Sequence, residues 1–539
     1  MSRFQRRGII VFCSLVLVFT LLYLRIAWLA ATPFYAETAQ SQSRYTLALT
    51  QGRGTIYDCN GNRLVNAESG YLAAVMPSQE NFAAVASHAV KLSRQELEQL
   101  WEQGKPCVVQ VDGEFDSPNT WIYQVPIRYG EDQLAQHVVG YTDSSGQGAA
   151  GVERGYESLL ASEDGGFSLT FTVDAFGRGV SMEEATGKLD NSAGVVLTLD
   201  REIQQICETT GEQYLEQGAV VAMEAATGKL RGVASFPSYS TDQLAEAVAD
   251  EENTPLMNRA FQAYAVGSVF KIVTAAAALE QGISPDFTHN CTGSITVDGT
   301  TFRCHHLAGH GLLDLKGALM ESCNPYFIAL SQQLDPTRFW QIACGLGFGC
   351  SAELGDNLIT ASGALPDPEE LKNSGAMSNF SFGQGALTAT PVQLAVMVSC
   401  VVNGGWAPSP SLVEGTTQNG TDLDTQRISP QLTQVMSQET ASILKEDLLA
   451  CVMEQPGQNA TAPNGEYVAG GKTGTAQTGQ MDENGEEYNN GWFAGFFNAG
   501  GTDYVVVVLS QQAESGNADA APVFRQIALE MTAKYQTQA

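Results

Sequence analysis

The sequence predicts an α+β protein with an N-terminal membrane helix, a mixed, β-rich domain, and a larger C-terminal domain built on an antiparallel sheet flanked by helices. Three observations predict this class. An apolar run covers residues 8–31. Short apolar segments joined by turn residues form hairpin patterns in the second half of the chain, and helical patterns separate them. A chain of 539 residues is also long enough for two or three domains.

The apolar run predicts a single-pass membrane anchor. It is long enough to cross a bilayer, and Arg25 near its end can reach the interface. Three arginines precede it, and positive charge before a span keeps that end in the cytoplasm. We therefore expect a cytoplasmic tail at 1–7, a signal-anchor helix at 8–31, and the remainder outside the cytoplasm. A cleaved signal peptide is the alternative, but no clean small-x-small cleavage site follows the run.

Residues 32–185 are predicted to form the β-rich domain. A polar tether is expected over 32–48, followed by strand-like runs such as 71–76 and a helix over 81–101. No catalytic constellation is evident in this region. It is therefore interpreted as a spacer, or pedestal.

Residues 190–539 are predicted to form the C-terminal domain. Asp200 is placed to cap a helix, and Pro522 stands in the first turn of the last one. The expected elements are a helix at 201–215, a hairpin of 218–223 with 230–236, a hairpin of 492–498 with 504–509, and a helix at 522–535.

Charge and cysteine content narrow the function. The net charge is −31, which disfavours nucleic-acid binding because phosphate backbones need Lys and Arg. Cys291 and Cys304 bracket a short segment and are interpreted either as a disulfide or as two ordinary thiols. With His305, His306 and His310 they could also be metal ligands, but the spacing resembles a zinc site only loosely. We expect no metal and no cofactor.

The first chemical motif is Gly267-Ser268-Val-Phe-Lys271. An Ala-rich apolar run follows, so Ser268 is expected at a helix N-terminus with Lys271 on the same face. A serine hydroxyl is a weak nucleophile that needs a base, and a lysine kept neutral by burial can serve. Ser442 and Lys445 form a second Ser-x-x-Lys, but neighbouring carboxylates would keep Lys445 charged.

Two further motifs follow along the chain. In Ser322-Cys-Asn324, the hydroxyl can relay a proton and the amide can hold a substrate amide. In Lys472-Thr473-Gly474-Thr475, the lysine and hydroxyls can bind a carboxylate, and the glycine lets a ligand approach the backbone. The N–H groups of Thr475 and Ser268 could form an oxyanion hole. A Walker phosphate loop is excluded because Glu466 stands where it needs glycine.

Ser-x-x-Lys, Ser-x-Asn and Lys-Thr-Gly, in this order, form the motif set of penicillin-binding proteins and class A β-lactamases. From the anchor to the last helix the chain resembles a class B penicillin-binding protein. The segments that carry the resemblance are Arg53–Asp58 with Asn60-Gly61, Gly151-Val-Glu153 with Tyr156-Glu157, Asn258-Arg259-Ala260, Phe382–Gly385 with Thr390-Pro391, Trp492-Phe493 and Pro522-Val-Phe524. Departures from the usual family pattern are Cys59, Val266 and Glu224-Ala225, none of which removes a catalytic group.

The resemblance implies a serine D,D-transpeptidase that cross-links peptidoglycan stem peptides. Ser268 would form an acyl-enzyme and release D-alanine, with Lys271 as base and Ser322 and Asn324 as relay and positioning groups. Lys472, Thr473, Gly474 and Thr475 would bind the substrate. β-Lactams would acylate the same serine, and a membrane-embedded glycan polymerase is the implied partner. Residues 291–324 resemble sporulation-type and division-type members.

Other functions remain as alternatives. A D,D-carboxypeptidase or β-lactamase-like hydrolase would use the same residues with water as the acceptor. A catalytically silent wall-assembly scaffold would retain the fold alone, and a β-lactam sensor would need more than the seven residues expected before the span. A metalloenzyme around the histidines would be sensitive to chelators, and we expect no such sensitivity.

Overall fold

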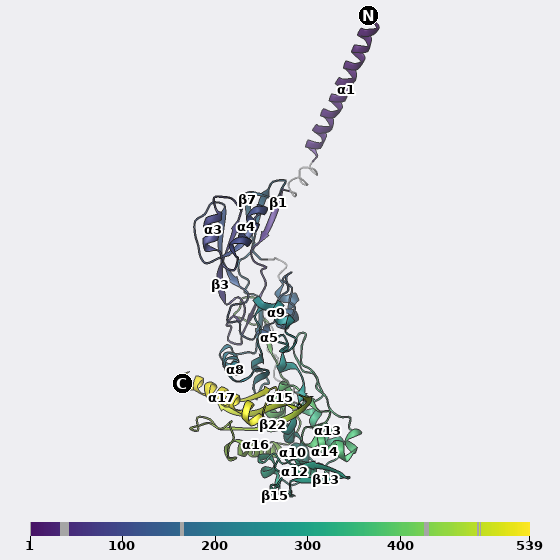
Figure 1. Ribbon diagram of the computed structural model, residues 1–539, viewed down its shortest axis with the longest axis vertical. Helices are drawn as coiled ribbons and strands as arrows, with labels where there is room; N and C mark the ends of the chain where they lie inside the picture. Colours follow the sequence, from purple (N-terminus) through teal and green to yellow (C-terminus); the bar gives the residue numbers. More distant parts are fainter. Residues whose placement is uncertain are drawn as a thin grey trace. The chain divides into compact units, whose positions relative to one another are not determined.

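The computed structural model describes residues 2–32, 43–161, 166–424, 431–481, 485 and 487–538 (Figure 1). The chain divides into two compact units that alternate along the sequence. Unit 1 comprises Met1–Arg53, Glu68–Ile127 and Ser162–Asn191, and unit 2 comprises Gly54–Ala67, Arg128–Ala161 and Ser192–Ala539. The tether predicted over 32–48 lies largely outside the described residues. The domain limits drawn from the sequence remain a prediction.

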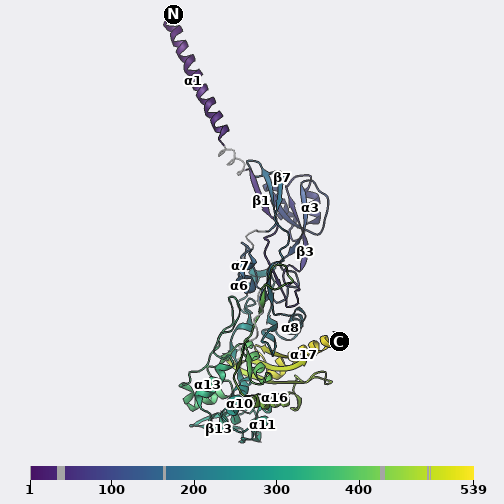
Figure 2. The same cartoon turned by 180° about the vertical axis from the view of Figure 1, so that it is seen from behind.

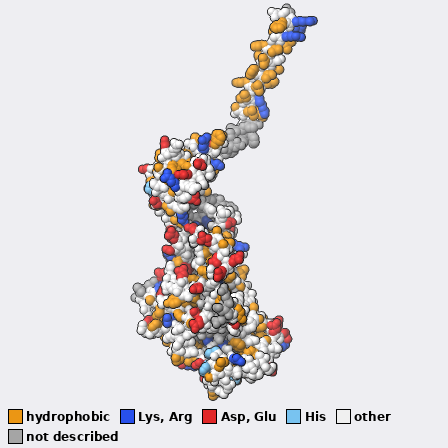
Figure 3. Space-filling view, viewed as in Figure 1, with side chains coloured by type: hydrophobic (Ala, Val, Ile, Leu, Met, Phe, Trp, Pro, Cys, Tyr) orange, Lys and Arg blue, Asp and Glu red, His pale blue; other side chains and the backbone are white. Residues whose placement is uncertain are grey.

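Helix α1 (Arg3–Ala31) is the one described helix long and apolar enough to cross a membrane. Ser2 caps it, since its hydroxyl accepts a hydrogen bond from the Gln5 N–H at 3.3 Å. Apolar side chains cover the visible face of the helix, and basic side chains lie at its start (Figure 3). None of its residues is buried in protein. Exposure of this kind fits a membrane-spanning helix.

Unit 1 contains two antiparallel three-stranded sheets, ordered β1-β6-β7 and β4-β3-β5. The helix predicted over 81–101 is wrong as a single element, because α3 and α4 are separate. Lys91 adopts a positive φ of 66°, and Ser93 with Glu96 forms a capping box that begins α4. The elements of unit 1 are β1 (Arg44–Ala48), β3 (Glu68–Val75), α3 (Phe82–His88), α4 (Arg94–Gln103), β4 (Cys107–Val111), β5 (Thr120–Ile127), β6 (Ser168–Val173) and β7 (Gly179–Thr186).

Unit 2 is built on a five-stranded antiparallel sheet in the order β10-β9-β24-β23-β22. Both predicted hairpins are present: β9 (Gly218–Glu224) pairs with β10 (Leu230–Phe236), and β23 (Glu487–Ala499) pairs with β24 (Thr502–Ser510). The edge strand is β22 (Ala469–Met481). The α+β class with an antiparallel sheet flanked by helices is therefore confirmed.

Helices bury both faces of this sheet. On one face α8 (Arg201–Tyr214) and α17 (Ala521–Gln538) lie side by side (Figure 1, Figure 2). On the other lie α15 (Pro391–Val402) and α16 (Gln438–Met453). Side chains alternate between the two cores, so Trp492 packs with the α15 side and Phe493 with the α17 side. As predicted, the Asp200 carboxylate caps α8 by accepting from the Glu202 and Ile203 N–H groups.

The remaining elements of unit 2 surround the sheet. They are β2 (Thr55–Tyr57), α5 (Gln136–Val139), α6 (Gly151–Gly155), α7 (Glu157–Leu160), β8 (Gly194–Leu197), α9 (Leu244–Ala249), β11 (Tyr264–Ala265), η3 (Gly267–Phe270), α10 (Lys271–Glu280), β12 (His289–Cys291), β13 (Ser294–Val297), β14 (Thr300–Arg303), β15 (Gly311–Leu313), α11 (Leu315–Met320), α12 (Asn324–Ser331), α13 (Pro336–Gly345), β16 (Glu353–Gly355), β17 (Leu358–Ile359), α14 (Ser374–Ser381), β18 (Thr388–Ala389), β19 (Trp406–Pro408), β20 (Val413–Thr417) and β21 (Leu432–Gln434), with short 3₁₀ or π turns η1 (Thr241–Gln243), η2 (Arg259–Phe261), η4 (Glu370–Lys372) and η5 (Gly516–Ala520).

Residues 54–67 and 128–161 join unit 2 through specific pairings. Strand β2 pairs in parallel with β8, which pairs with β20. The fully buried Glu153 carboxylate lies 2.6 Å from the Arg128 guanidinium, which also donates to the Gly54 carbonyl. A buried carboxylate needs such a partner. These contacts account for the Gly-Val-Glu segment that the sequence resemblance singled out.

Candidate active site

Ser268 lies in the short 3₁₀ turn η3, directly before α10. Gly267 adopts a left-handed φ of 64°, and a Cβ there would lie 2.7 Å from the Thr475 carbonyl oxygen. Only glycine fits this conformation and spacing. Val269 and Phe270 are buried, whereas Ser268 is partly exposed. The turn therefore presents the Ser268 hydroxyl at the surface while its neighbours anchor it.

Lys271 is the first residue of α10, and its side chain is fully buried. Its Nζ lies 3.0 Å from Ser268 Oγ and 3.1 Å from Ser322 Oγ. Nζ also lies 2.6 Å from the Ser322 carbonyl oxygen and 2.7 Å from Asn324 Oδ1. Burial, and after it the charge of Lys472, lowers the pKa of Lys271 well below its ordinary value.

Ser322 and Asn324 reach Lys271 from the junction of α11 and α12. Ser322 has a left-handed φ of 50°, unusual for a residue with a side chain. Asn324 begins α12, and Pro325 follows in its first turn. Helix α12 packs against α10 and the small strands β12, β13 and β14, so these elements fix the junction beside Lys271. The first two predicted motifs are thus brought together.

The third motif lies on β22. Lys472 and Gly474 pair with Ala494 and Trp492 of β23. A Cβ at Gly474 would lie 2.8 Å from Val269 Cγ2 and 3.0 Å from the Val266 carbonyl oxygen, so β22 packs directly on the turn that carries Ser268.

The side chains of this motif differ in exposure. Lys472 is buried, with its Nζ 3.2 Å from the Thr473 carbonyl oxygen, and burial lowers its pKa. Thr473 is partly buried. Thr475 is exposed, and its Oγ1 accepts a hydrogen bond from the Gly516 N–H at 3.2 Å. The edge strand therefore offers a cation and hydroxyl groups next to the Ser268 turn.

Sequence reasoning missed one residue that supports this turn. The fully buried Trp492 indole N–H donates to the Ala265 carbonyl at 2.8 Å, three residues before Ser268. In the sequence, Trp492 stood out only as part of the Trp492-Phe493 segment that carries the family resemblance.

The second Ser-x-x-Lys has a different setting. Ser442 is exposed on α16, and Lys445 Nζ lies 3.8 Å from an Asp503 carboxylate oxygen. Lys445 is thus partly exposed to water and lies beside a carboxylate, unlike the fully buried Lys271. This pair therefore lacks the features of a nucleophile with its base.

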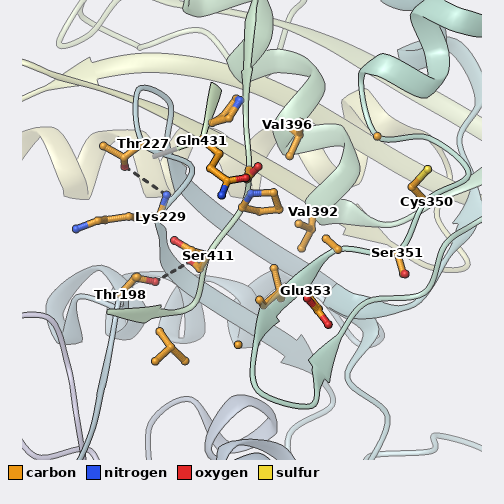
Figure 4. A pocket seen from close by; sticks show the side chains of 18 of the residues that line it. Thr198, Thr227, Lys229, Cys350, Ser351, Glu353, Val392, Val396, Ser411 and Gln431 are labelled. Atoms are coloured by element: carbon orange, nitrogen blue, oxygen red, sulfur yellow. Dashed lines mark hydrogen bonds between the residues drawn. The ribbon is translucent and has the colours of Figure 1, made fainter. Parts of the chain in front are cut away.

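A separate hollow of about 1270 Å³ opens elsewhere in unit 2. Figure 4 shows Thr227 Oγ1 accepting from the Lys229 N–H, and Thr198 Oγ1 donating to the Ser411 carbonyl. The Lys229 ammonium is paired with Glu414 at 2.8 Å. None of the predicted site residues is among those that line this hollow.

Comparison with known proteins agrees with this geometry. Residues 218–529 match the model of the penicillin-binding protein transpeptidase domain. The chain belongs to this family. The resemblance to class B penicillin-binding proteins drawn from the sequence is confirmed. The matched segment contains all three motifs and the whole five-stranded sheet.

Two relatives show how similar this penicillin-binding protein is to named members of the family. It is 29% identical over 458 residues to stage V sporulation protein D of Bacillus subtilis, covering 79% of this chain and 69% of that protein. It is 30% identical over 429 residues to penicillin-binding protein PbpB of Mycolicibacterium smegmatis, covering 74% and 64%. The chain thus spans about two thirds of the length of these relatives.

Solved structures share the fold. Penicillin-binding protein 3 of Mycobacterium tuberculosis, complexed with aztreonam, superposes with a TM-score of 0.65 at 24% identity, over 91% of this chain and 97% of that one. A chain from a peptidoglycan synthase complex gives a TM-score of 0.70 at 24% identity, over 98% of both chains. The similarity of fold thus covers the N-terminal part of the chain as well as the matched transpeptidase domain.

Proposed function

We propose that this penicillin-binding protein is a serine D,D-transpeptidase that cross-links peptidoglycan stem peptides through an acyl-enzyme at Ser268. The observation that carries the proposal is the position of the buried Lys271 Nζ, within 3.1 Å of both Ser268 Oγ and Ser322 Oγ. The proposed nucleophile and the proposed relay hydroxyl therefore both lie within hydrogen-bond distance of the proposed base.

The two shortest hydrogen bonds around Lys271 can both be formed by a neutral amine. The Ser322 carbonyl and Asn324 Oδ1, at 2.6 and 2.7 Å, are acceptors that take two N–H groups. A neutral amine has two such donors and one lone pair, which can accept the Ser268 proton. Burial and the nearby Lys472 charge lower the pKa of Lys271 and favour the same state.

The proposed reaction has two halves. Lys271 takes the Ser268 proton as Oγ attacks the carbonyl between two terminal D-alanines, and the backbone N–H groups of Ser268 and Thr475 stabilise the oxyanion. The proton passes through Lys271 and Ser322 to the leaving nitrogen, and D-alanine departs. An amine from a second stem peptide then attacks the ester and gives up its proton, which restores Ser268.

Substrate binding is assigned to the edge strand. Lys472 supplies positive charge for the terminal carboxylate, and Thr473 and Thr475 supply hydroxyl donors. Gly474, without a side chain, keeps the strand close to the Ser268 turn. β-Lactams carry a carboxylate and a reactive acyl group, so we expect them to acylate Ser268 in the same pose. The complex of a relative with aztreonam supports this expectation.

The organisation of the chain is part of the proposal. We assign 32–185 to a pedestal and 190–539 to the transpeptidase domain, with the catalytic part outside the cytoplasm. The three arginines at the start of α1 support this orientation. A membrane-embedded glycan polymerase is the proposed partner, supported by the neighbour that coordinates polymerization and crosslinking in a synthase complex.

The test uses the full chain in detergent with a peptide ending in D-Ala-D-Ala and an added amine acceptor. We expect D-alanine release together with a product that carries the acceptor. Ser268→Ala should abolish both, and Ser442→Ala, the matched control from the second Ser-x-x-Lys, should retain them. Release with water as the sole acceptor would instead make the protein a carboxypeptidase, and no release by folded wild type would make it a scaffold.

A further inference from the structure

Four sulfur and nitrogen ligands converge beside the proposed active site. The ligand atoms of Cys291, Cys304, His310 and Cys323 all lie within 4.8 Å of one another. Cys304 Sγ lies 3.5 Å from His310 Nδ1. In a tetrahedral zinc site, ligand bonds of about 2.0–2.3 Å place neighbouring ligand atoms about 3.3–3.8 Å apart. The cluster is therefore close to the size that one zinc ion needs.

The backbone holds the ligands at this spacing. Strands β12 and β15 pair Cys291 with Gly311, the residue after His310. The Cys304 N–H donates to the Gly293 carbonyl at 2.9 Å. A Cβ at Gly309 would lie 2.3 Å from the Cys291 carbonyl oxygen, so only glycine lets the two loops meet. Separate hairpins are thus tied together around the ligand atoms.

The four ligand side chains are buried, and their sulfur and imidazole nitrogen atoms are ligands that zinc prefers. The three cysteines are at most 2% exposed, and the His310 side chain is 6% exposed. All three are free thiols in the structure, including the Cys291 and Cys304 considered as a disulfide. Thiolate and imidazole ligands select zinc over the oxygen-preferring calcium and magnesium. We propose that Cys291, Cys304, His310 and Cys323 bind one zinc ion.

The ligand set makes this a structural site. Four protein ligands complete a tetrahedron and leave no position for substrate, unlike a catalytic zinc with three. His310 has a further partner, since its Nε2 lies 3.7 Å from a Glu321 carboxylate oxygen. A carboxylate on the distal nitrogen fixes the ring orientation of a metal-bound histidine. Glu321 therefore supports the site without contacting the ion.

The position of Cys323 gives the ion a role. Cys323 stands between Ser322 and Asn324, which both contact Lys271 Nζ. Ser322 has a left-handed φ that its surroundings must hold. Anchoring Cys323 to zinc keeps this strained segment against Lys271. This role rests on the proposed function, whereas the metal site does not.

The proposal replaces our expectation from the sequence that this segment binds no metal. That expectation considered Cys291, Cys304 and the three histidines as one local group. His305 and His306 are exposed, and the fourth ligand comes from the Ser-Cys-Asn motif. Spacing along the chain could not show that Cys323 folds back onto the others.

Metal content is the direct test. The full chain is purified in detergent without chelators, and zinc is measured by elemental mass spectrometry. We expect about one zinc ion per chain. Cys304→Ala should lose it, and Cys400→Ala, which removes a buried thiol on α15, should keep it. Wild type without zinc, or with two of the cluster sulfurs joined as a disulfide, would overturn the proposal.

Further measurements do not depend on how the alanine variant folds. Wild type reconstituted with Co²⁺ should show thiolate-to-cobalt charge-transfer absorption; a spectrum without it would overturn the site. His310→Cys should retain zinc, and Glu321→Gln should weaken zinc binding about 10-fold.

The positioning role has its own readout. Removing zinc from wild type should slow acylation by a fluorescent penicillin, and adding it back should restore the rate. Zinc bound at one per chain with unchanged acylation after its removal would overturn the role of the ion but not the site.

Discussion

Gly474→Ala tests whether strand β22 holds the turn that carries Ser268. The added methyl would lie 2.8 Å from Val269 Cγ2 and 3.0 Å from the Val266 carbonyl oxygen. Ordinary contacts between carbon atoms are about 3.5–4.0 Å. Val269 is fully buried and β-branched, so its side chain has little freedom to turn away. The strand or the turn must therefore shift by several tenths of an ångström.

The expected effects follow from that shift. Overpacking of this kind costs about 1–3 kcal/mol, which lowers the melting temperature by a few degrees and leaves the protein folded. A 1 Å displacement of reacting groups costs about 100-fold in rate, so a smaller shift predicts a loss of about 10-fold. Catalysis should thus fall further than stability alone explains.

The assay is the rate of acylation by a fluorescent penicillin, followed on gels, with a thermal melt of each variant. Gly113→Ala is the matched control, because its Cβ would meet nothing within 4 Å. It should match wild type in both measurements. A folded Gly474→Ala that acylates at the wild-type rate would refute the idea that β22 positions Ser268.

Three further predictions concern the same site. Lys271→Met should fold, by thermal melt, yet acylate about 10²–10⁴-fold more slowly, and a smaller loss would remove its role as base. The acylation rate should rise with pH through the lowered pKa of Lys271, because the neutral amine is the active form. Lys472→Met removes a like charge and raises the pKa of Lys271, so the rise should move to higher pH. An unchanged pH profile in Lys472→Met would contradict this coupling between the two lysines. Trp492→Phe leaves the Ala265 carbonyl without its donor and should cost about 1–3 kcal/mol in denaturant unfolding, and an unchanged midpoint would contradict this.

Local patterns were enough to predict much of unit 2. Asp200 before an amphipathic run predicted a capped helix, and turn residues between apolar runs predicted both hairpins. These features depend on neighbours in the sequence, so they survive without knowledge of the fold. The helix over 81–101 failed because a positive φ at Lys91 and a cap at Ser93 interrupt an otherwise helical pattern.

Contacts between residues far apart in the chain could not be predicted from the sequence. The sequence placed Ser268 and Lys271 on one face, but the contacts of Lys271 with Asn324 depend on how α12 packs on α10. Residues 54–67 and 128–161 belong to unit 2, although segments of unit 1 lie between them in the sequence. Strand β2, within 54–67, joins unit 2 by a parallel pairing with the distant strand β8. Cys323 joins the other soft ligands only after folding.

Covalent labelling by penicillin shows directly whether Ser268 is the nucleophile. Full-length wild type, Ser268→Ala and Ser442→Ala are incubated with a fluorescent penicillin, and labelling is measured on gels and by intact-protein mass. We expect one adduct on wild type and on Ser442→Ala and none on Ser268→Ala. An adduct of equal yield on folded Ser268→Ala would contradict this expectation, because the nucleophile would then lie elsewhere.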